Sequence, residues 1–367
     1  MRYYLIAGEA SGDLHGSNLV KAIKALDPDA EFRGWGGDLM AAAGVHLVKH
    51  YRDLAFMGFV KIIRNLPTIF RNLRFAREDM LAFRPDALIL IDYPGFNLRL
   101  TRWAHDQGLK VIYYISPQVW AWKENRVKSI KTSVDKMLVI LPFEKDFYRR
   151  WDYEVDYVGH PLVEVVAAAK AGKPLGDKPI VALLPGSRKQ EVSVQLPVML
   201  AVSTRFPSHQ FIVAKAPGLD EDFYKEFLQG YPGVQSIRGN TYGLLLQSEA
   251  ALVTSGTATL ETALFGVPEA VCYKGDPISY QIARRLIKVK YISLVNLIMD
   301  KPVVRELIQD DMNPTTVGDE LERLLNNEAY RARIKEDYAS LKTLLQQDGD
   351  ASAQAARQIV AFSGKNA

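Results

Sequence analysis

Residues Val253–Gly266 read VTSGTATLETALFG, and this stretch sets the fold class of the chain. The apolar run 250–253 predicts a buried strand, and a turn of small residues leads into a helix with Leu260 and Leu264 on one face. A strand, a tight turn and a helix in this order predict one βα unit of a parallel sheet.

The turn of this unit carries candidate anion-binding groups. The free N–H groups and the dipole at a helix start favour an anion. Ser255 and Thr257 add hydroxyl donors, and Gly256 lets the backbone approach a ligand closely. Glu261, one turn into the helix, could accept hydrogen bonds from ribose hydroxyls if the anion is a nucleotide diphosphate. An ordinary capped helix explains the same residues, so this stretch alone does not decide between the two.

A second turn of the same design lies at 180–191, which reads IVALLPGSRKQE. An apolar strand is followed by Gly186 and Ser187, and then by Arg188, whose planar guanidinium suits bidentate contact with a phosphate. A surface charge after a turn is the alternative for Arg188, but the strand and the Gly-Ser turn favour phosphate binding. Two such turns predict one phosphate site built from neighbouring loops.

Composition bounds the class of protein. The chain has 367 residues, which predicts two domains, and its 48% hydrophobic and 24% charged content is ordinary for a globular protein. The net charge of +4 argues against a dedicated nucleic-acid binder. The single cysteine, Cys272, rules out internal disulfides and fits a reducing compartment. The first residues predict a strand rather than a signal peptide, and no apolar stretch is long enough to span a bilayer.

Apolar runs at regular intervals predict two series of parallel strands with helices between them. The runs lie at 2–7, 31–35, 87–91, 110–115, 136–141 and 154–158, and then at 180–184, 210–214, 234–237, 250–253 and 269–273. The expected fold is α/β, with two doubly wound, Rossmann-like parallel-sheet domains facing across a cleft. We expect domains at 1–160 and 161–345, and a terminal helix at 346–367 that could pack back on the first domain.

Asp92 follows the apolar strand 87–91, in the sequence IDYPGFN. Open α/β sheets bind ligands at the carboxyl ends of strands, so Asp92 is a candidate general base that takes a proton from an attacking hydroxyl. Capping of the helix that begins near Asn97 is the competing interpretation. After the next strand, Trp120 and Trp122 supply aromatic surfaces that suit sugar faces or acyl chains, or that simply pack.

The loop after the first strand reads GEASGDLHG at 8–16 and lacks the GxGxxG pattern of dinucleotide-binding folds. Its two carboxylates disfavour a phosphate and could instead bind sugar hydroxyls. The candidate residues of this loop are Glu9, Ser11, Gly12 and Asp13.

Residues 52–84 combine apolar and aromatic side chains with arginines at helical spacing. Seven basic residues against three acidic ones give this segment an excess equal to the +4 of the whole chain. Such a segment is typical of membrane-surface attachment. It is equally typical of an amphipathic helix that packs on its own sheet and leaves its basic face in water.

We expect no metal site and no cofactor. No pair among the six histidines has zinc-ligand spacing with a third ligand, and no Asp-x-Asp string follows an apolar strand. Stabilisation of a leaving diphosphate would therefore fall to Arg188 and the helix starts.

Eight motifs occur together in this chain: AGEASGDLHG, IDYPGFN, ISPQVWAWKENRV, LPFEKDFY, VGHP, LPGSRKQEV, TSGTATLE and YISLVNLI. In this order, over residues 3–313, they closely resemble the lipid-A-disaccharide synthases, bacterial glycosyltransferases of the GT-B fold. The resemblance implies transfer of 2,3-diacylglucosamine from UDP to 2,3-diacylglucosamine 1-phosphate. The expected product carries a β-1,6 bond formed with inversion, and UDP leaves.

The resemblance assigns roles to matching residues, beginning with Asp92 as the base for the acceptor hydroxyl. The implied UDP-sugar site is Gly186, Ser187, Arg188, Ser255, Gly256, Thr257, Glu261 and Asn296, the last chosen by the resemblance alone. The implied cleft and acceptor residues are Glu9, Ser11, Gly12, Asp13, Trp120 and Trp122. The implied membrane contacts, in the acceptor-binding first domain, are Phe56, Met57, Phe59, Ile62, Ile63, Arg64, Phe70, Arg71 and Arg74.

The resemblance also implies a peripheral enzyme on the cytoplasmic face of the inner membrane, with no nucleic-acid partner. The family dimerises through exchanged C-terminal parts, so a homodimer is a candidate assembly. The loop Pro117-Gln118-Val119 and the aromatic, arginine-rich segment 56–84 depart from the family pattern, which affects acyl-chain and acceptor details rather than the reaction. One alternative is a UDP-N-acetylglucosamine 2-epimerase, which has no use for the basic-apolar segment. Another is a nucleotide-sugar-binding protein at the membrane surface, which has no use for Asp92.

Overall fold

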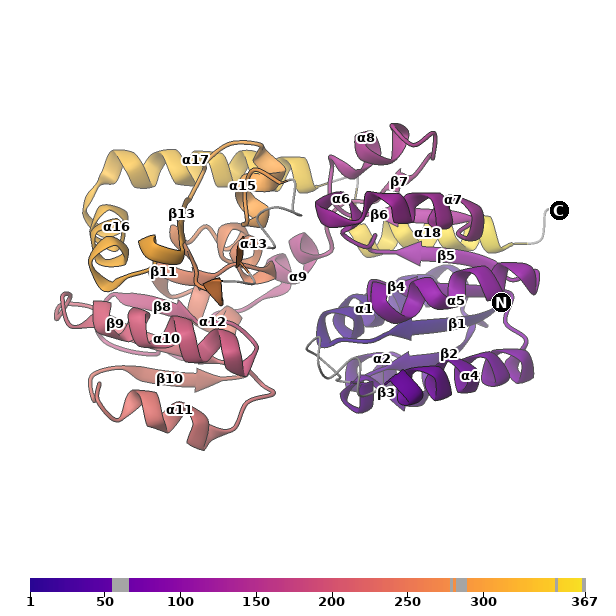
Figure 1. Ribbon diagram of the computed structural model, residues 1–367, viewed down its shortest axis with the longest axis horizontal. Coiled ribbons are helices and arrows are strands. Elements are labelled where there is room, and N and C mark those ends of the chain that lie inside the picture. The colour runs from indigo at the N-terminus through magenta and orange to yellow at the C-terminus, as the bar shows by residue number, and fades with distance from the viewer. Residues whose placement is uncertain (55–65, 278–279, 282–288, 347–348, 365–367) are drawn as a thin grey trace. The chain divides into compact units, whose positions relative to one another are not determined.

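The computed structural model describes residues 1–367 except 55–65, 278–279, 282–288, 347–348 and 365–367. The described chain divides into two compact units. Unit 1 is Met1–Pro161 with Leu345–Ala367, and unit 2 is Leu162–Leu344. Each unit contains one parallel sheet flanked by helices (Figure 1), which confirms the predicted α/β class with two doubly wound parallel-sheet domains.

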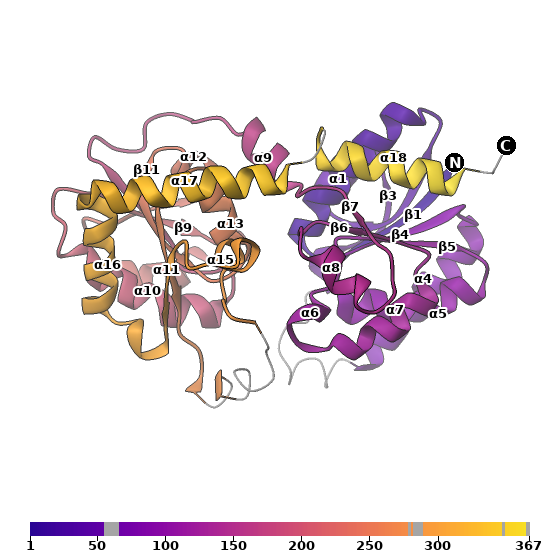
Figure 2. The same cartoon turned by 90° about the horizontal axis from the view of Figure 1, so that it is seen from above.

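Unit 1 is built on seven described strands in the order β3-β2-β1-β4-β5-β6-β7. The strands are β1 (Arg2–Ala7), β2 (Glu31–Gly36), β3 (His46–His50), β4 (Ala87–Ile91), β5 (Lys110–Tyr114), β6 (Lys136–Val139) and β7 (Asp156–Tyr157). The helices are α1 (Ala10–Leu26), α2 (Asp38–Ala42), η1 (Tyr51–Leu54), α4 (Leu66–Phe83), α5 (Pro94–Asp106), α6 (Val119–Trp122), η2 (Glu124–Arg126), α7 (Val127–Ser133), α8 (Glu144–Arg149) and α18 (Ala351–Ser363). Figure 2 shows α1 and α18 on one face of this sheet and α4, α5 and α7 on the other.

Unit 2 is built on six described strands in the order β10-β9-β8-β11-β12-β13. The strands are β8 (Ile180–Leu184), β9 (Gln210–Lys215), β10 (Gln235–Arg238), β11 (Ser248–Thr254), β12 (Glu269–Tyr273) and β13 (Arg305–Ile308). The helices are α9 (Leu162–Ala168), α10 (Lys189–Ser203), α11 (Glu221–Leu228), α12 (Thr241–Leu245), α13 (Thr257–Leu264), α15 (Leu294–Met299), η3 (Gln309–Asp311), α16 (Pro314–Asn326) and α17 (Glu328–Leu345).

The central strands form around continuous apolar runs of four or more residues. Residues Tyr3–Ala7 of β1 and Ala87–Ile91 of β4 are completely buried, and in unit 2 β8 and residues 250–254 of β11 are buried as well. Strands of a parallel sheet covered on both faces read as continuous apolar runs rather than as alternating ones. The cores therefore lie between each sheet and its two helical layers.

The C-terminal helix α18 belongs to unit 1, where it packs on α1 and β5. Lys110, the first residue of β5, donates from Nζ to the carbonyl oxygens of Phe362 (3.0 Å), Ser363 (3.1 Å) and Gly364 (3.2 Å). The last carbonyls of a helix lack partners within the helix, and a cation there also complements the helix dipole. Lys110 thus anchors the end of the described chain to the sheet.

Both sheets contain a topological switch point, where the strand order reverses. In unit 1 it lies between the paired strands β1 and β4, and in unit 2 between the paired strands β8 and β11. All described strand pairs are parallel, so the carboxyl ends of neighbouring strands meet at one edge. Open α/β sheets place their ligands at this position.

Candidate functional site

The two predicted anion-binding turns of unit 2 flank its switch point. Gly186, Ser187 and Arg188 follow β8, and Ser255 and Gly256 follow β11. Because β8 and β11 are hydrogen-bonded neighbours, the two turns lie next to each other. The expected pair of adjacent loops is therefore present, and it combines two helix starts at one sheet edge.

The turn after β8 already holds a carboxylate. Gly186 has a φ of +110°, and a Cβ there would lie 2.8 Å from Glu191 Oε2. The amides of Ser187 and Arg188 each donate to Glu191 Oε2 at 3.2 Å, and Arg188 Nη1 lies 2.9 Å from Glu191 Oε1. The Arg188 side chain is 60% exposed. The turn after β8 thus binds one anionic group, the Glu191 carboxylate, through two backbone amides and a guanidinium.

Glu191 was not among the predicted site residues. It follows the helix N-cap by three residues, which is the spacing of the acidic member of a capping box. That spacing is a signal in the sequence LPGSRKQE that points to Glu191 as the partner of the turn.

The turn after β11 is open. Gly256 has a φ of +149° and is the N-cap residue of α13, and Thr257 begins that helix on the surface. The amides of Gly256 and Thr257 donate to no acceptor among the described residues. The Ser255 hydroxyl is occupied, since it donates to the carbonyl oxygen of Ile292 at 2.8 Å. Ser255 therefore positions the segment around Ile292, while the helix start offers free N–H groups.

Glu261 lies one turn into α13, half-buried. One of its oxygens accepts a 2.8 Å hydrogen bond from the Tyr242 hydroxyl. Burial raises the pKa of the Glu261 carboxyl, and the hydrogen bond from Tyr242 acts in the opposite direction. Tyr242 thus fixes the orientation of a carboxyl group that keeps a second oxygen as a hydrogen-bond acceptor.

Asn296 is buried, and its side-chain amide bonds to neighbours within unit 2. It is 1% exposed, its Nδ2 donates to Val304 O and to Glu306 Oε1, and its Oδ1 accepts from Val304 N. Glu306 also accepts from the amides of Ile292 and Ser293 and from the Ser293 hydroxyl. These bonds occupy the Asn296 amide within unit 2, and a direct UDP-sugar contact of Asn296 stays a prediction. Asn296 and Glu306 shape the segment that the Ser255 hydroxyl contacts.

Asp92 lies at the switch point of unit 1, directly after β4. Asp92 and Tyr93 have φ values of +45° and +49°, which non-glycine residues rarely adopt. The backbone is held by Tyr113, whose hydroxyl donates to Asp92 O at 2.6 Å, and by Asn97, whose Nδ2 donates to the same oxygen at 2.8 Å. Strained backbone that is fixed by neighbours is characteristic of functional sites. The N-cap residue of α5 is Tyr93 rather than Asp92.

The Asp92 carboxyl is electrostatically suited to accept a proton. Burial, followed by the negative charge of Glu9, raises its pKa to about 7. Glu9 ends the loop after β1, the strand that pairs with β4. A carboxylate with a pKa near the working pH combines a useful ionised fraction with appreciable basicity.

The first loop does not present all of its predicted residues to a ligand. Asp13 is 3% exposed, and its carboxylate accepts from the amides of Gly37 (2.7 Å), Leu39 (3.1 Å) and Met40 (2.9 Å). Asp13 therefore caps the start of α2, and its assignment to the acceptor site stays a prediction. Gly12 is buried against Ala7, whereas Glu9 is half-buried and Ser11 is exposed.

The two tryptophans have different environments. Trp120 is 9% exposed, donates from Nε1 to Glu144 Oε1 at 3.2 Å and packs edge-on against Phe143. Burial raises the pKa of the Glu144 carboxyl, which accepts this hydrogen bond from Trp120, to about 7. Trp122 is 50% exposed, with Lys123 over its ring. Of the two, Trp122 is the one whose ring is available to a ligand.

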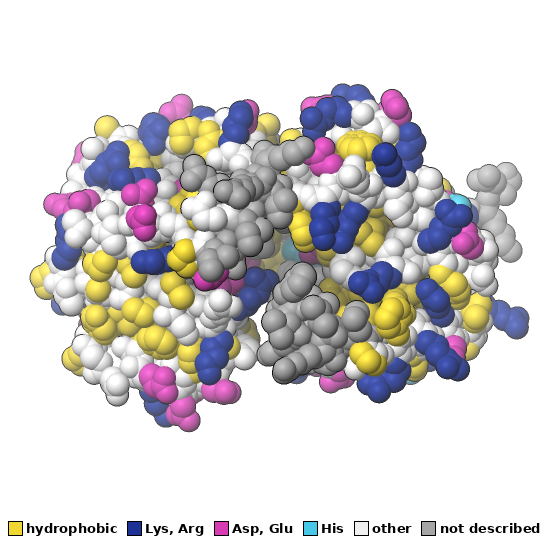
Figure 3. Space-filling view, in the orientation of Figure 1, with side chains coloured by type: hydrophobic (Ala, Val, Ile, Leu, Met, Phe, Trp, Pro, Cys, Tyr) yellow, Lys and Arg dark blue, Asp and Glu magenta, His cyan; other side chains and the backbone are white. Residues whose placement is uncertain are grey.

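The predicted membrane segment is only partly described. Phe56, Met57, Phe59, Ile62, Ile63 and Arg64 lie outside the described residues. Phe70, Arg71 and Arg74 lie on α4, and all three are exposed. In Figure 3, dark-blue Lys and Arg side chains border a yellow hydrophobic area on the face that α4 and α5 cover.

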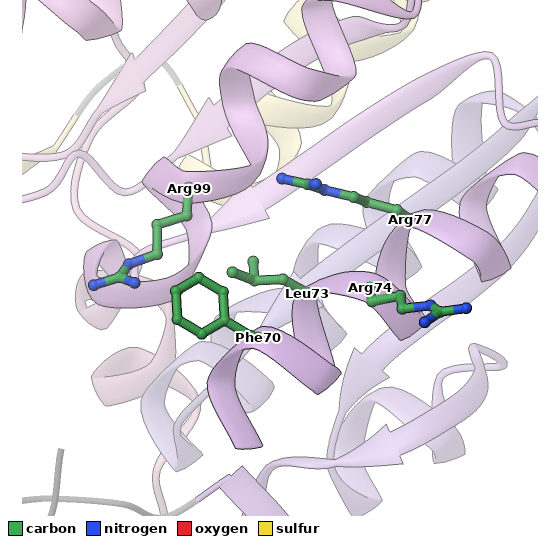
Figure 4. A pocket seen from close by; sticks show the side chains of 5 residues that line it. All are labelled: Phe70, Leu73, Arg74, Arg77 and Arg99. Carbon is green, nitrogen blue, oxygen red and sulfur yellow. The ribbon is translucent and has the colours of Figure 1, made fainter. Parts of the chain in front are cut away.

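A hollow lies between α4 and α5. It is lined by Phe70, Leu73, Arg74, Arg77 and Arg99. Figure 4 shows Phe70 and Leu73 turned toward α5, with the guanidinium of Arg74 directed away from the other labelled side chains. Arg74 is paired with Glu78 at 2.7 Å, and Arg77 lies over the Trp103 ring. This surface thus combines an exposed aromatic ring with cationic groups.

The described residues contain neither a metal-binding cluster nor a membrane-spanning helix. Among the described residues, no group of three or more His, Cys, Asp or Glu side chains is arranged to hold a metal ion. Within the same residues, no helix has the length and apolar character needed to cross a membrane.

Two doubly wound parallel-sheet units, each with a topological switch point, are the architecture of the GT-B fold. Solved structures have the same fold. A kitacinnamycin glycotransferase gives a TM-score of 0.66 at 14% identity, with 99% of each chain covered. The UDP-GlcNAc 2-epimerase from Neisseria meningitidis, bound to UDP-GlcNAc, gives 0.66 at 11% identity, again with 99% of each chain covered. At such identities these likenesses establish the fold alone.

Sequence comparison identifies the family. The pattern of the lipid-A-disaccharide synthetase family matches residues 3–360. The lipid-A-disaccharide synthase of Syntrophus aciditrophicus is 43% identical over 354 residues, covering 93% of this chain and 92% of the relative. That of Coxiella burnetii (strain CbuG_Q212) is 38% identical over 370 residues, covering 97% and 96%. The chain belongs to the lipid-A-disaccharide synthetase family and is a glycosyltransferase of lipid A biosynthesis. The epimerase alternative is not favoured.

Proposed function

We propose that this enzyme transfers 2,3-diacylglucosamine from UDP to 2,3-diacylglucosamine 1-phosphate, forming a β-1,6 bond with inversion. The observation that carries the proposal is Asp92, a carboxyl with its pKa raised to about 7 on a fixed backbone at the switch point of unit 1. Family membership supplies the class of reaction.

In the proposed step, the Asp92 carboxylate accepts the proton of the acceptor hydroxyl. The hydroxyl oxygen forms a new bond to C1 of the donor sugar, while the bond from C1 to the diphosphate oxygen breaks and its electron pair leaves with UDP. A single displacement of this kind inverts the configuration at C1. Unit 1 would therefore act as the acceptor-binding unit.

Unit 2 would hold the UDP-sugar. The amides at the start of α13 and the Arg188 guanidinium are donors for the diphosphate, and they would stabilise the charge that develops on it. Glu191 would have to release the amides of Ser187 and Arg188 when the diphosphate binds there. Glu261 would accept from the ribose hydroxyls.

The test is release of UDP by the purified protein with UDP-2,3-diacylglucosamine, with and without 2,3-diacylglucosamine 1-phosphate. Release that needs both substrates and yields a tetra-acylated disaccharide phosphate supports the proposal. Release or sugar conversion without the acceptor would contradict it and would move the activity to the hydrolase or epimerase class.

We also propose that segment 56–77 contacts the membrane surface, where both acylated substrates reside, on the cytoplasmic face. The exposed Phe70 and the cationic side chains Arg71 and Arg74 support this part. Changing Arg71 and Arg74 to Ser should weaken sedimentation with vesicles that contain anionic lipid. Unchanged partition would contradict the electrostatic contribution.

A further inference from the structure

Two cations share one exposed indole ring in unit 1. Lys123 Nζ lies 4.0 Å from the centre of the Trp122 ring, and Arg126 Cζ lies 5.9 Å from the same centre. Partial burial, followed by the charge of Arg126, lowers the pKa of Lys123. Neither side chain forms an ion pair or a hydrogen bond with an acidic group of the described residues. Two like charges held together without a counter-charge form a site for an anion.

This cluster lies at the sheet edge that carries Asp92. It follows β5, which pairs in parallel with β4, so the carboxyl ends of the two strands are neighbours. Tyr113 of β5 links the two places, because its hydroxyl donates to Asp92 O at 2.6 Å. Burial and the charge of Asp92 raise the Tyr113 pKa, and the charge of Arg126 acts in the opposite direction. Arg126 is therefore within electrostatic reach of the Tyr113 hydroxyl.

Other charged groups described at this edge are either acidic or already paired. Glu9 and Asp92, at the switch point, are acidic and would repel a phosphate. Arg52, after β3, is paired with Asp38 at 3.1 Å. Lys123 and Arg126 are thus cations at this edge that remain available to a ligand.

We propose that Lys123 and Arg126 bind the phosphate of the acceptor, with the Trp122 ring against the adjoining sugar or acyl surface. This inference rests on the proposed function and extends it to acceptor selection. A phosphate monoester carries nearly two negative charges, which match the two cations. The guanidinium can bind two phosphate oxygens in parallel, and the ammonium adds a compact point charge. Aromatic rings present an apolar face next to a polar edge.

The experiment compares two acceptors in detergent-dispersed form: 2,3-diacylglucosamine 1-phosphate and the same sugar with a methyl group in place of the phosphate. In the double variant Lys123→Gln, Arg126→Gln, we expect kcat/KM for the phosphorylated acceptor to fall roughly 10- to 100-fold, as for lost charge-assisted hydrogen bonds. The kcat/KM for the methyl acceptor should stay the same within about twofold, because that acceptor never used the site. Arg126→Lys should recover part of the loss.

The matched control is Lys128→Gln, which removes one exposed charge from α7, just beyond the cluster. It should change neither acceptor's kcat/KM by more than about twofold, since an isolated surface charge contributes little. Thermal unfolding of each variant checks that unit 1 stays folded.

The possible failures are distinct. Equal loss with both acceptors, or no loss with either, would overturn the inference while leaving the transferase intact. Equal loss accompanied by weaker vesicle sedimentation would assign the cluster to lipid headgroups instead. If the unmodified enzyme transfers sugar to neither acceptor, the proposed function itself is overturned.

Discussion

The switch points of the two units have the same topology and opposite chemistry. The edge of unit 1 carries Glu9 and Asp92, and the mutual repulsion of these acids helps to raise the Asp92 pKa to about 7. The edge of unit 2 carries two helix starts and Arg188, and the acid nearest to this arginine, Glu191, accepts hydrogen bonds from the amides of its turn. The shared scaffold thus suits one unit to proton transfer and the other to binding an anion.

The largest effect on activity is expected at Asp92. The change Asp92→Asn keeps the size of the side chain and removes its basicity, so turnover should fall about 10²- to 10⁴-fold. The Kd for UDP should not change, because UDP binding is assigned to unit 2. Rates of UDP release and calorimetric titration with UDP measure the two effects. Parallel losses in both would mean that the division of roles is wrong.

The complementary change lies in unit 2. Arg188→Gln removes the guanidinium from the turn after β8 and should weaken UDP binding about 10- to 100-fold, the range for a charge-assisted hydrogen bond. Lys189→Gln removes the same charge one residue later and serves as the control. Calorimetric titration with UDP measures the Kd of each variant. An equal loss of UDP affinity in Arg188→Gln and Lys189→Gln would indicate that the overall positive charge of the region matters, rather than a specific contact by Arg188.

A smaller effect, on stability rather than activity, is expected at Asp13. Asp13→Ala leaves the amides of Gly37, Leu39 and Met40 without their acceptor and should lower the free energy of unfolding by about 1–3 kcal/mol. Denaturant unfolding measures the change. Ser11→Ala, at an exposed position of the same loop, should leave stability unaltered. An Asp13 variant of normal stability that lost acceptor binding would instead support the assignment of Asp13 to the acceptor site.

The smallest effect concerns pH. Because the base must be ionised, kcat/KM should rise with pH through about 7 and then level off. Glu9→Gln removes a negative charge that raises the Asp92 pKa, so the rising limb should move to lower pH. The pH profiles of the two proteins test this. A limb that stays in place would show that burial alone sets the pKa.

The sequence predicts the central strands well and the edge strands unevenly, since β7 and β10 match the predicted runs 154–158 and 234–237 but two other edge strands do not. β1 and β4 occupy the predicted ranges, since a strand buried on both faces must be apolar throughout. β3 (HLVKH) and β13 (RELI), at sheet edges, were missed, because half-exposed strands tolerate charged residues and leave no apolar run.

The same limit applies to the candidate site. Asp92, Arg188 and Gly256 could be chosen because each lies in the turn that follows a buried strand. The capping role of Asp13 depends on amides more than twenty residues away. The engagement of Asn296 by Glu306 likewise requires a strand that the sequence did not reveal. Local pattern locates the edge of a sheet, but only tertiary contacts show which side chains are already in use.

The position of α18 has a consequence for synthesis of the chain. Unit 2 lies within 162–344, whereas unit 1 needs residues at both ends, because α18 covers α1 and Lys110 holds its last carbonyls. Domains generally fold as units while the chain emerges from the ribosome. Unit 2 can therefore complete its core during translation, but the first strands to emerge must wait for the last helix. Until then the face of α1 that α18 covers is exposed, so unit 1 is the part of the nascent chain most dependent on protection from aggregation.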